Sequence, residues 1–306
     1  MRKLLKRILP IVIIAVIFLF LGKNLVENWS SIPFGDLHFN IWFLILSFLF
    51  LIPHFLSYSK SWQVIMRTLG SSISFAQSTW MIATTQIAKY MPGRIWYMLG
   101  RVYVGKKQKM PGETLAVSMI LETCLLLITS SVIFLMCSML VGTYKVVNIL
   151  ASFILLVIAI VVINPRILNW ITNFVLRILK KPGVKITLSY KQMLKLSIYY
   201  FGLWIAQIVG FYFLVNSIYQ LPISSIFTLA SAHTLSWIIG FVVLFAPSGL
   251  GVREGVMTLL LSPILPTPLA IAVSFLSRIW MTVFEIVVFF MGLLVKKMSN
   301  RENNNH

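Results

Sequence analysis

The sequence predicts an all-α polytopic membrane protein, and three observations carry that prediction. Of its 306 residues, 59% are hydrophobic and only 11% are charged, and the mean hydropathy is +0.92. Apolar segments long enough to cross a bilayer, which takes about 20 residues, recur along the chain. The formal net charge is +19, which in such a chain reflects basic residues that flank the spans and orient them. This composition excludes a soluble globular domain, and we expect no nucleic-acid partner.

Ten apolar segments can be separated. Six predict full transmembrane helices, at 8–25, 41–62, 114–141, 146–163, 194–218 and 269–295. The other four form two broken pairs, 75–90 with 94–105 and 225–246 with 252–262. Three of these four are too short to span a bilayer alone, whereas 225–246 is long enough and is assigned from topology. Segment 8–25 lacks a small-residue cleavage pattern, so we expect a retained signal-anchor helix.

Basic residues decide on which side of the membrane each loop lies. Four precede segment 8–25, three follow segment 94–105, seven lie between Arg166 and Lys195, and three occupy the C-terminal tail. All these groups fall on one side only if each broken pair enters and leaves the membrane on the same side. Nineteen of the 26 basic residues then lie in cytoplasmic segments. We therefore predict two re-entrant hairpins and a multi-pass protein of the cell (cytoplasmic) membrane, with both termini in the cytoplasm.

The predicted topology contains a symmetry. Residues 1–306 form a single integral membrane domain whose halves, 8–141 and 146–296, each read as two spans, a broken-helix hairpin and a further span. The two hairpins open to opposite sides, which makes the halves inverted repeats. The basic loop between the halves shows apolar residues at helical spacing over 167–179, which predicts an amphipathic helix at the cytoplasmic surface.

The hairpin breaks are the most informative local feature. Proline and glycine interrupt the apolar segments at Pro92, Gly93, Pro247, Gly249 and Gly251. Irregular backbone at membrane depth is tolerated only where protein or a water-filled cavity satisfies its polar groups. A half-helix that starts after such a break presents free N–H groups and a positive dipole end, where phosphate binds readily. Arg94 and Arg253 adjoin these starts, and arginine binds phosphate oxygens in a bidentate manner.

Ionisable side chains at membrane depth complete the candidate site, because they are costly there and usually functional. The substrate-binding candidates are Arg94, Arg101, Glu122, Arg253, Glu254, Arg278 and Glu285. One interpretation is that they form buried ion pairs that fix helix packing. The other, which we favour for the set, is that they line a polar cavity for an anionic headgroup. For His233, a hydrogen-bonded buried histidine is favoured over a ligand.

The two broken elements resemble a known family. Tyr90-Met91-Pro92-Gly93-Arg94-Ile95-Trp96, Gly100-Arg101 and Glu122 pair with Pro247-Ser248-Gly249-Leu250-Gly251-Val252-Arg253-Glu254-Gly255. This combination resembles the lysylphosphatidylglycerol synthase transmembrane region, also called the flippase-like domain family, over roughly residues 8 to 295. In the synthases the resemblance implies movement of aminoacylated phosphatidylglycerol between leaflets. We expect a stand-alone member without the aminoacyl-transferase domain, so synthase activity is not carried over.

These features predict a lipid translocase rather than an enzyme. Its cargo would be an anionic or modified phospholipid or a lipid-linked envelope intermediate. The sequence has no metal-ligand cluster, nucleophile elbow or phosphate-binding loop, so we expect no catalytic residue, metal or cofactor. The predicted partner is a membrane lipid with an anionic or phosphate headgroup, and a homo-oligomer is left open. Two alternatives remain: a membrane enzyme acting on a lipid phosphate, with Glu254 or Glu285 as base, and a non-transporting accessory protein of envelope lipid or glycan synthesis.

Overall fold

The computed structural model describes residues 37–90, 96–141, 165–178, 189–243 and 249–304, together with residues 23 and 35. Across these residues the secondary structure is helical, apart from an isolated antiparallel bridge between Leu37 and Tyr219. Apart from residue 23, the predicted spans 8–25 and 146–163 lie outside the described residues, as do most of the two breaks, at 91–95 and 244–248. The sites predicted at Pro92, Gly93, Arg94 and Pro247 therefore fall outside the described part of the chain.

The described helices follow the apolar segments of the sequence. They are α2 (Ile41–Thr68), α3 (Phe75–Gln86), η3 (Ile87–Tyr90), α4 (Trp96–Lys107), α5 (Gly112–Val141), α7 (Pro165–Ile178), α8 (Tyr190–Asn216), η4 (Ile223–Ser225), α9 (Ile226–Val242), α10 (Val252–Leu261) and α11 (Thr267–Asn304). Within the described residues, five helices are long and apolar enough to cross a membrane: α2, α5, α8, the η4–α9 segment and the first part of α11. The chain is an all-α polytopic membrane protein, as predicted.

Side chains just outside the helices define several of their starts. The Asn40 Oδ1 atom accepts hydrogen bonds from the amides of Trp42 and Phe43, at 3.0 and 3.2 Å, and so caps α2. Capping boxes open α3, between Ser74 and Gln77, and α8, between Ser189 and Gln192. These caps satisfy amides that the first helical turn leaves without partners.

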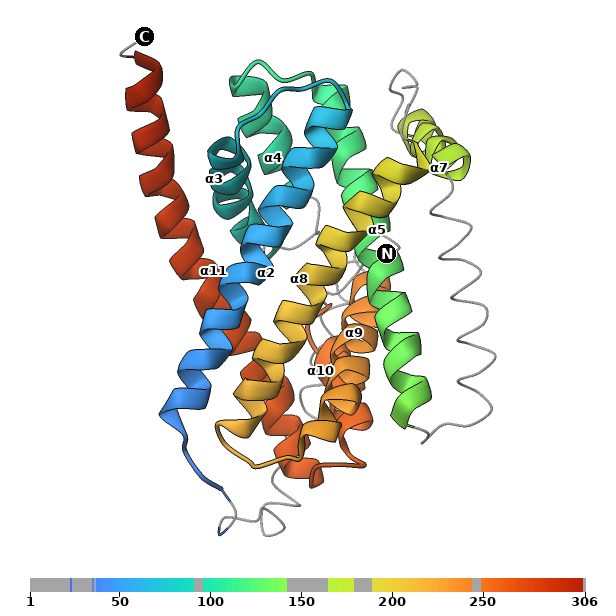
Figure 1. The fold of residues 1–306 in the computed structure, drawn as a ribbon, viewed down its shortest axis with the longest axis vertical. Helices are drawn as coiled ribbons and strands as arrows, with labels where there is room; N and C mark the ends of the chain where they lie inside the picture. Colours follow the sequence, from blue (N-terminus) through green and yellow to red (C-terminus); the bar gives the residue numbers. More distant parts are fainter. Residues whose placement is uncertain are drawn as a thin grey trace, which may run out of the picture.

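The helices pack in two matching sets around α2 and α8, which lie side by side in the middle of the molecule (Figure 1). Helix α3 packs against α11, and helix α9 packs against α5. Helix α4 contacts α3 and α5, just as α10 contacts α9 and α11. In Figure 1, α3 and α4 lie toward the end that holds α7 and the C-terminus, while α9 and α10 lie toward the opposite end. This packing is the arrangement expected of two re-entrant hairpins in inverted halves. The hairpins and the inverted repeat remain predictions.

Buried aromatic side chains join the central helices through polar contacts. The Trp62 indole on α2 donates to the Ser118 hydroxyl on α5, at 3.1 Å. The Trp204 indole on α8 donates to the Thr129 hydroxyl, also on α5 and also at 3.1 Å. Because lipid is as apolar as these side chains, close packing and such interhelical hydrogen bonds hold membrane helices together. These contacts join α2, α5 and α8, and the shorter helices α3, α4, α9 and α10 pack around them.

Helix α7 confirms the predicted helix in the basic loop. It covers Pro165–Ile178, close to the predicted 167–179. Trp170 and Phe174 are exposed and their rings stack with centroids 5.7 Å apart. Four residues apart, they share one helix face, which forms an apolar surface suited to the membrane interface.

Cysteine labelling tests the predicted topology. In a background without Cys124 and Cys137, we expect Gln108→Cys to react with a membrane-impermeant thiol reagent from the cytoplasmic side only. Ser262→Cys, at the exposed end of α10, should react from the outside only. Both positions lie at helix ends, so the substitutions disturb little packing. If Gln108→Cys were labelled from outside, the pair of oppositely directed hairpins would be wrong.

Candidate functional site

The second break is held by glycines. Gly249 and Gly251 have φ angles of +69° and +81°, a region that suits glycine. A Cβ atom on Gly249 would lie 2.8 Å from the Cα atom of Gly240 on α9, so the turn lies directly against that helix. Helix α10 then begins at Val252, with Gly251 as its N-cap and Arg253 in its first turn. The break therefore places Arg253 at the N-terminus of the half-helix α10.

The predicted first hairpin contributes a fully buried ion pair. An Arg101 Nη atom on α4 lies 2.6 Å from the carboxylate of Glu122 on α5, and the two residues are 0% and 2% exposed. The Tyr58 hydroxyl on α2 donates to the same carboxylate. The guanidinium also lies over the Trp62 ring, 5.2 Å from its centroid. This cluster fixes α4 against α5 and α2.

The predicted second hairpin contributes a matching pair with the charges exchanged. Arg278 on α11 donates to the carboxylate of Glu254 on α10. Here the carboxylate is on the hairpin and the arginine on the following span, the reverse of Arg101 and Glu122. Each predicted hairpin is thus tied to the span that follows it by an arginine–glutamate pair, which is fully buried for Arg101–Glu122 and partly buried for Arg278–Glu254.

A third ion pair joins elements of the two predicted halves. Lys89, at the end of the first hairpin's leading arm, donates to Glu285 on α11. Beside it, the Tyr90 hydroxyl lies 3.0 Å from the Thr282 hydroxyl. Arg278 and Glu285 share one helix, as the sequence indicates, but each pairs with a residue of a different hairpin and not with the other.

Arg253 differs from the other cations. It is 9% exposed, and its Nε atom is buried without a hydrogen-bond partner. Across the described residues, the site holds four cations (Lys89, Arg101, Arg253 and Arg278) and three carboxylates (Glu122, Glu254 and Glu285). The three carboxylates pair with Lys89, Arg101 and Arg278. Among the residues that the structure describes, the site therefore has one more cation than carboxylates.

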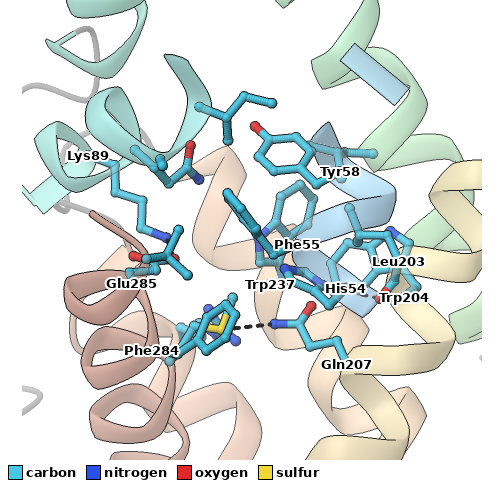
Figure 2. A pocket seen from close by; sticks show the side chains of 17 residues that line it. His54, Phe55, Tyr58, Lys89, Leu203, Trp204, Gln207, Trp237, Phe284 and Glu285 are labelled. Atoms are coloured by element: carbon cyan, nitrogen blue, oxygen red, sulfur yellow. Dashed lines mark hydrogen bonds and ion pairs between the residues drawn. The ribbon is translucent and has the colours of Figure 1, made fainter. Parts of the chain in front are cut away.

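Two adjoining cavities lie among these residues; together they are called the polar cavity. Their volumes are about 110 and 130 Å³, and both are lined by Tyr58, Gln86, Lys89, Leu126, Trp237 and Arg253. Glu285 lines the first, and Glu122 and Arg278 line the second. Figure 2 shows Lys89 reaching toward Glu285 on one side of the first cavity, with His54, Trp204 and Gln207 on the other. Arg101 and Glu254 line neither cavity. Each is paired with a residue that does, Arg101 with Glu122 and Glu254 with Arg278.

Several residues that line the polar cavity were not predicted from the sequence. Tyr58 and Gln86 lie within ordinary apolar helices, where a single polar residue carries little signal. Lys89 is visible as a basic residue beside the first break, but nothing in the sequence indicates its partner. For His233 the predicted burial is confirmed, at 1% exposure, but the predicted hydrogen bonding is wrong, because neither ring nitrogen has a hydrogen-bond partner. Its ring packs against Phe211 instead, with centroids 5.0 Å apart.

Metal-binding potential can be assessed for the described residues. Among them, no three His, Cys, Asp or Glu side chains are grouped closely enough to hold a metal ion. The carboxylates of the polar cavity are instead paired with cations. The charged side chains that line the cavity can bind a charged group.

This fold and site define a polytopic membrane protein with a cavity lined by charged residues of the shorter helices and the spans. The chain belongs to the family described as lysylphosphatidylglycerol synthase TM region, whose model matches residues 7–288. The resemblance seen in the two broken elements is thereby confirmed. The family places the chain among membrane domains related to lipid-modifying and flippase-like proteins. A search of curated proteins found no significant match.

Proposed function

We propose that this protein is a lipid translocase that moves an anionic or modified phospholipid, or a lipid-linked envelope intermediate, between the leaflets of the cytoplasmic membrane. The observation that carries the proposal is Arg253, a buried cation at the polar cavity that no carboxylate of the described residues balances. An isolated buried charge is costly, so a counter-ion is expected wherever one persists. The headgroup phosphate of a lipid supplies that counter-ion.

The surroundings of Arg253 suit a phosphate. The residue lies in the first turn of α10, where the amides and the helix dipole favour an anion. Its guanidinium can bind two phosphate oxygens at once. Lys89 and Arg278 line the same cavity, and their existing carboxylate partners limit how much further negative charge they attract. The polar cavity is thereby matched to about one net negative charge.

The packing of the hairpins supports movement of the bound lipid. The Arg101–Glu122 and Arg278–Glu254 pairs each tie the second arm of a predicted hairpin to its own following span, whereas the first arms, α3 and α9, pack against the last span of the other predicted half. The Lys89–Glu285 ion pair adds to these contacts between the two predicted halves. An anionic headgroup competes with Glu285 for Lys89, which loosens this connection. Rocking of one half against the other around a central site is how inverted-repeat transporters expose that site alternately.

Proteoliposomes provide the test of transport. Purified protein is reconstituted into phosphatidylglycerol-containing vesicles with a trace of fluorescent phosphatidylglycerol, and an impermeant quencher reports which leaflet the label occupies. We expect the inner-leaflet label to become accessible in protein-containing vesicles and to remain protected in protein-free ones. Chromatography of the lipids should show no new product. Protected label with unchanged lipid, over a panel of anionic lipids, would contradict the proposal.

One observation favours the enzymatic alternative. The second carboxylate oxygen of Glu285 is buried without a hydrogen-bond partner, and Glu285 lines the polar cavity. A carboxylate oxygen so placed can act as a general base that takes a proton from a water or hydroxyl nucleophile as it attacks a bound lipid phosphate and displaces the leaving alcohol or phosphate. A membrane enzyme of this kind would convert the added lipid into a new product in the same vesicles, and Glu285→Gln would abolish that product. Neither flux nor product is the result expected of a non-transporting accessory protein.

A further inference from the structure

A second, larger hollow lies beside the polar cavity, on the side of α2 and α11. It measures about 550 Å³ and is here called the α2–α11 groove. It is lined by α2 residues between Leu44 and Leu56, α11 residues between Val283 and Val295, and Thr79 and Ala83 of α3. Thr79 is the only lining residue with a polar side chain, and its hydroxyl donates to the Phe75 carbonyl, at 2.8 Å. An apolar ligand can therefore fill the groove without leaving a polar group of its lining side chains unpaired.

We propose that the α2–α11 groove binds one acyl chain of the lipid whose headgroup occupies the polar cavity. The inference rests on the proposed function, because it assigns the hydrophobic part of the same substrate. It names the substrate class as a lipid with a long flexible hydrocarbon chain, and it gives the route by which that lipid enters from the bilayer.

The lining residues that the two hollows share carry the argument. Phe55, Ala83, Phe284 and Val288 line both the groove and the first cavity. The rings of Phe55 and Phe284 meet edge to face, with centroids 6.4 Å apart, and form the wall between the two spaces. One side of this wall presents Lys89 and Glu285, and the other presents aliphatic side chains. An adjoining charged and apolar pair of sites fits an amphiphile, whereas a protein helix laid in the groove would leave the charged side unused.

The dimensions fit one chain. The α2 residues from Leu44 to Leu56 cover about 18 Å of helix. One leaflet contributes about 15 Å, half of a hydrocarbon core roughly 30 Å thick. Because Gly292 has no side chain, α11 approaches α3 closely at the floor of the groove; a Cβ atom on Gly292 would lie only 2.5 Å from the Cβ of Ala83. Groove residues such as Leu49 and Val287 are about half exposed, so the groove is open to the surrounding lipid.

A bulky substitution in the groove tests the proposal by binding rather than by transport. Val287 lines the groove and is 51% exposed, so Val287→Trp fills the groove without disturbing the core. The neighbouring Ile286 is 40% exposed and does not line the groove, which makes Ile286→Trp the matched control. The probes are long-chain and dihexanoyl phosphatidylglycerol, titrated onto detergent-purified full-length protein. We expect Val287→Trp to weaken long-chain binding on the order of tenfold, the contribution of about two buried methylenes. Dihexanoyl binding should be unchanged, as should both affinities in Ile286→Trp.

The outcomes separate this inference from the proposed function. Loss of long-chain binding in Val287→Trp alone supports the groove site even if vesicles show no lipid flux. Unchanged long-chain binding in Val287→Trp overturns the groove site even if flux is present. Equal weakening for both probes also overturns it, because the effect would then not concern the chain. A long-chain affinity that depends on protein concentration would show that a second copy of the protein occupies the groove, and would likewise overturn it.

Discussion

Glu122→Gln is expected to destabilise the protein by about 3–5 kcal/mol, because it strands the Arg101 guanidinium in the interior. Arg101 is 0% exposed, and Glu122 is its carboxylate partner at 2.6 Å. A glutamine keeps the size of the side chain and an oxygen that can accept from Tyr58, so the change removes the charge and little else. Thermal unfolding of the detergent-purified protein measures the loss.

Two further variants show whether the effect is the pairing itself. Arg101→Met with Glu122→Gln removes both charges, so most of the lost stability should return, because no uncompensated charge then remains buried. Glu113→Gln, at an exposed position in the first turn of the same helix, should change stability by no more than about 0.5 kcal/mol. A double mutant no more stable than Glu122→Gln would show that the pair is not what holds α4 against α5.

Arg253→Ala is expected to have the opposite profile: a folded protein with little lipid flux. Arg253 has no carboxylate partner among the described residues, so its removal strands no charge. Truncating a buried, hydrogen-bonded charge partner weakens binding by about 2–5 kcal/mol, which corresponds to a loss of roughly thirtyfold or more. The vesicle assay should show this loss while the unfolding temperature is maintained or raised.

Arg253→Lys provides the graded control. Lysine keeps the charge but lacks the planar fork, so we expect flux between those of Arg253→Ala and the unmodified protein. Full flux in Arg253→Ala, at equal amounts of reconstituted protein, would remove Arg253 from headgroup binding. Loss of flux together with loss of folding would mean that the arginine balances structural charge instead.

The parts of the fold that follow from short-range pattern could be predicted from the sequence. The spans at α2, α5, α8 and α11 follow from the length of their apolar segments, and α7 follows from helical periodicity in a basic loop. The start of α10 beside Arg253 follows from the glycines before it, since positive φ angles interrupt a helix. These signals are local, so one segment of sequence is enough to read them.

The partners within the site could not be predicted, because they depend on which helices meet. Helical spacing places Arg278 and Glu285 on one face of α11. It does not indicate that Arg278 pairs with Glu254, or that Glu285 pairs with Lys89. Tyr58 joins the Glu122 carboxylate only because α2 packs beside α5. The charge imbalance that singles out Arg253 appears only once each of the other cations described in the site has been paired with its carboxylate.

Native mass spectrometry of lipid that remains bound through purification tests the central claim most directly, namely that the unbalanced charge of Arg253 holds an anionic headgroup. The account predicts an anionic lipid bound to the unmodified protein, less of it on Arg253→Lys and none on Arg253→Ala. Retention of the same anionic lipid by Arg253→Ala, or of zwitterionic lipid alone by the unmodified protein, would contradict it.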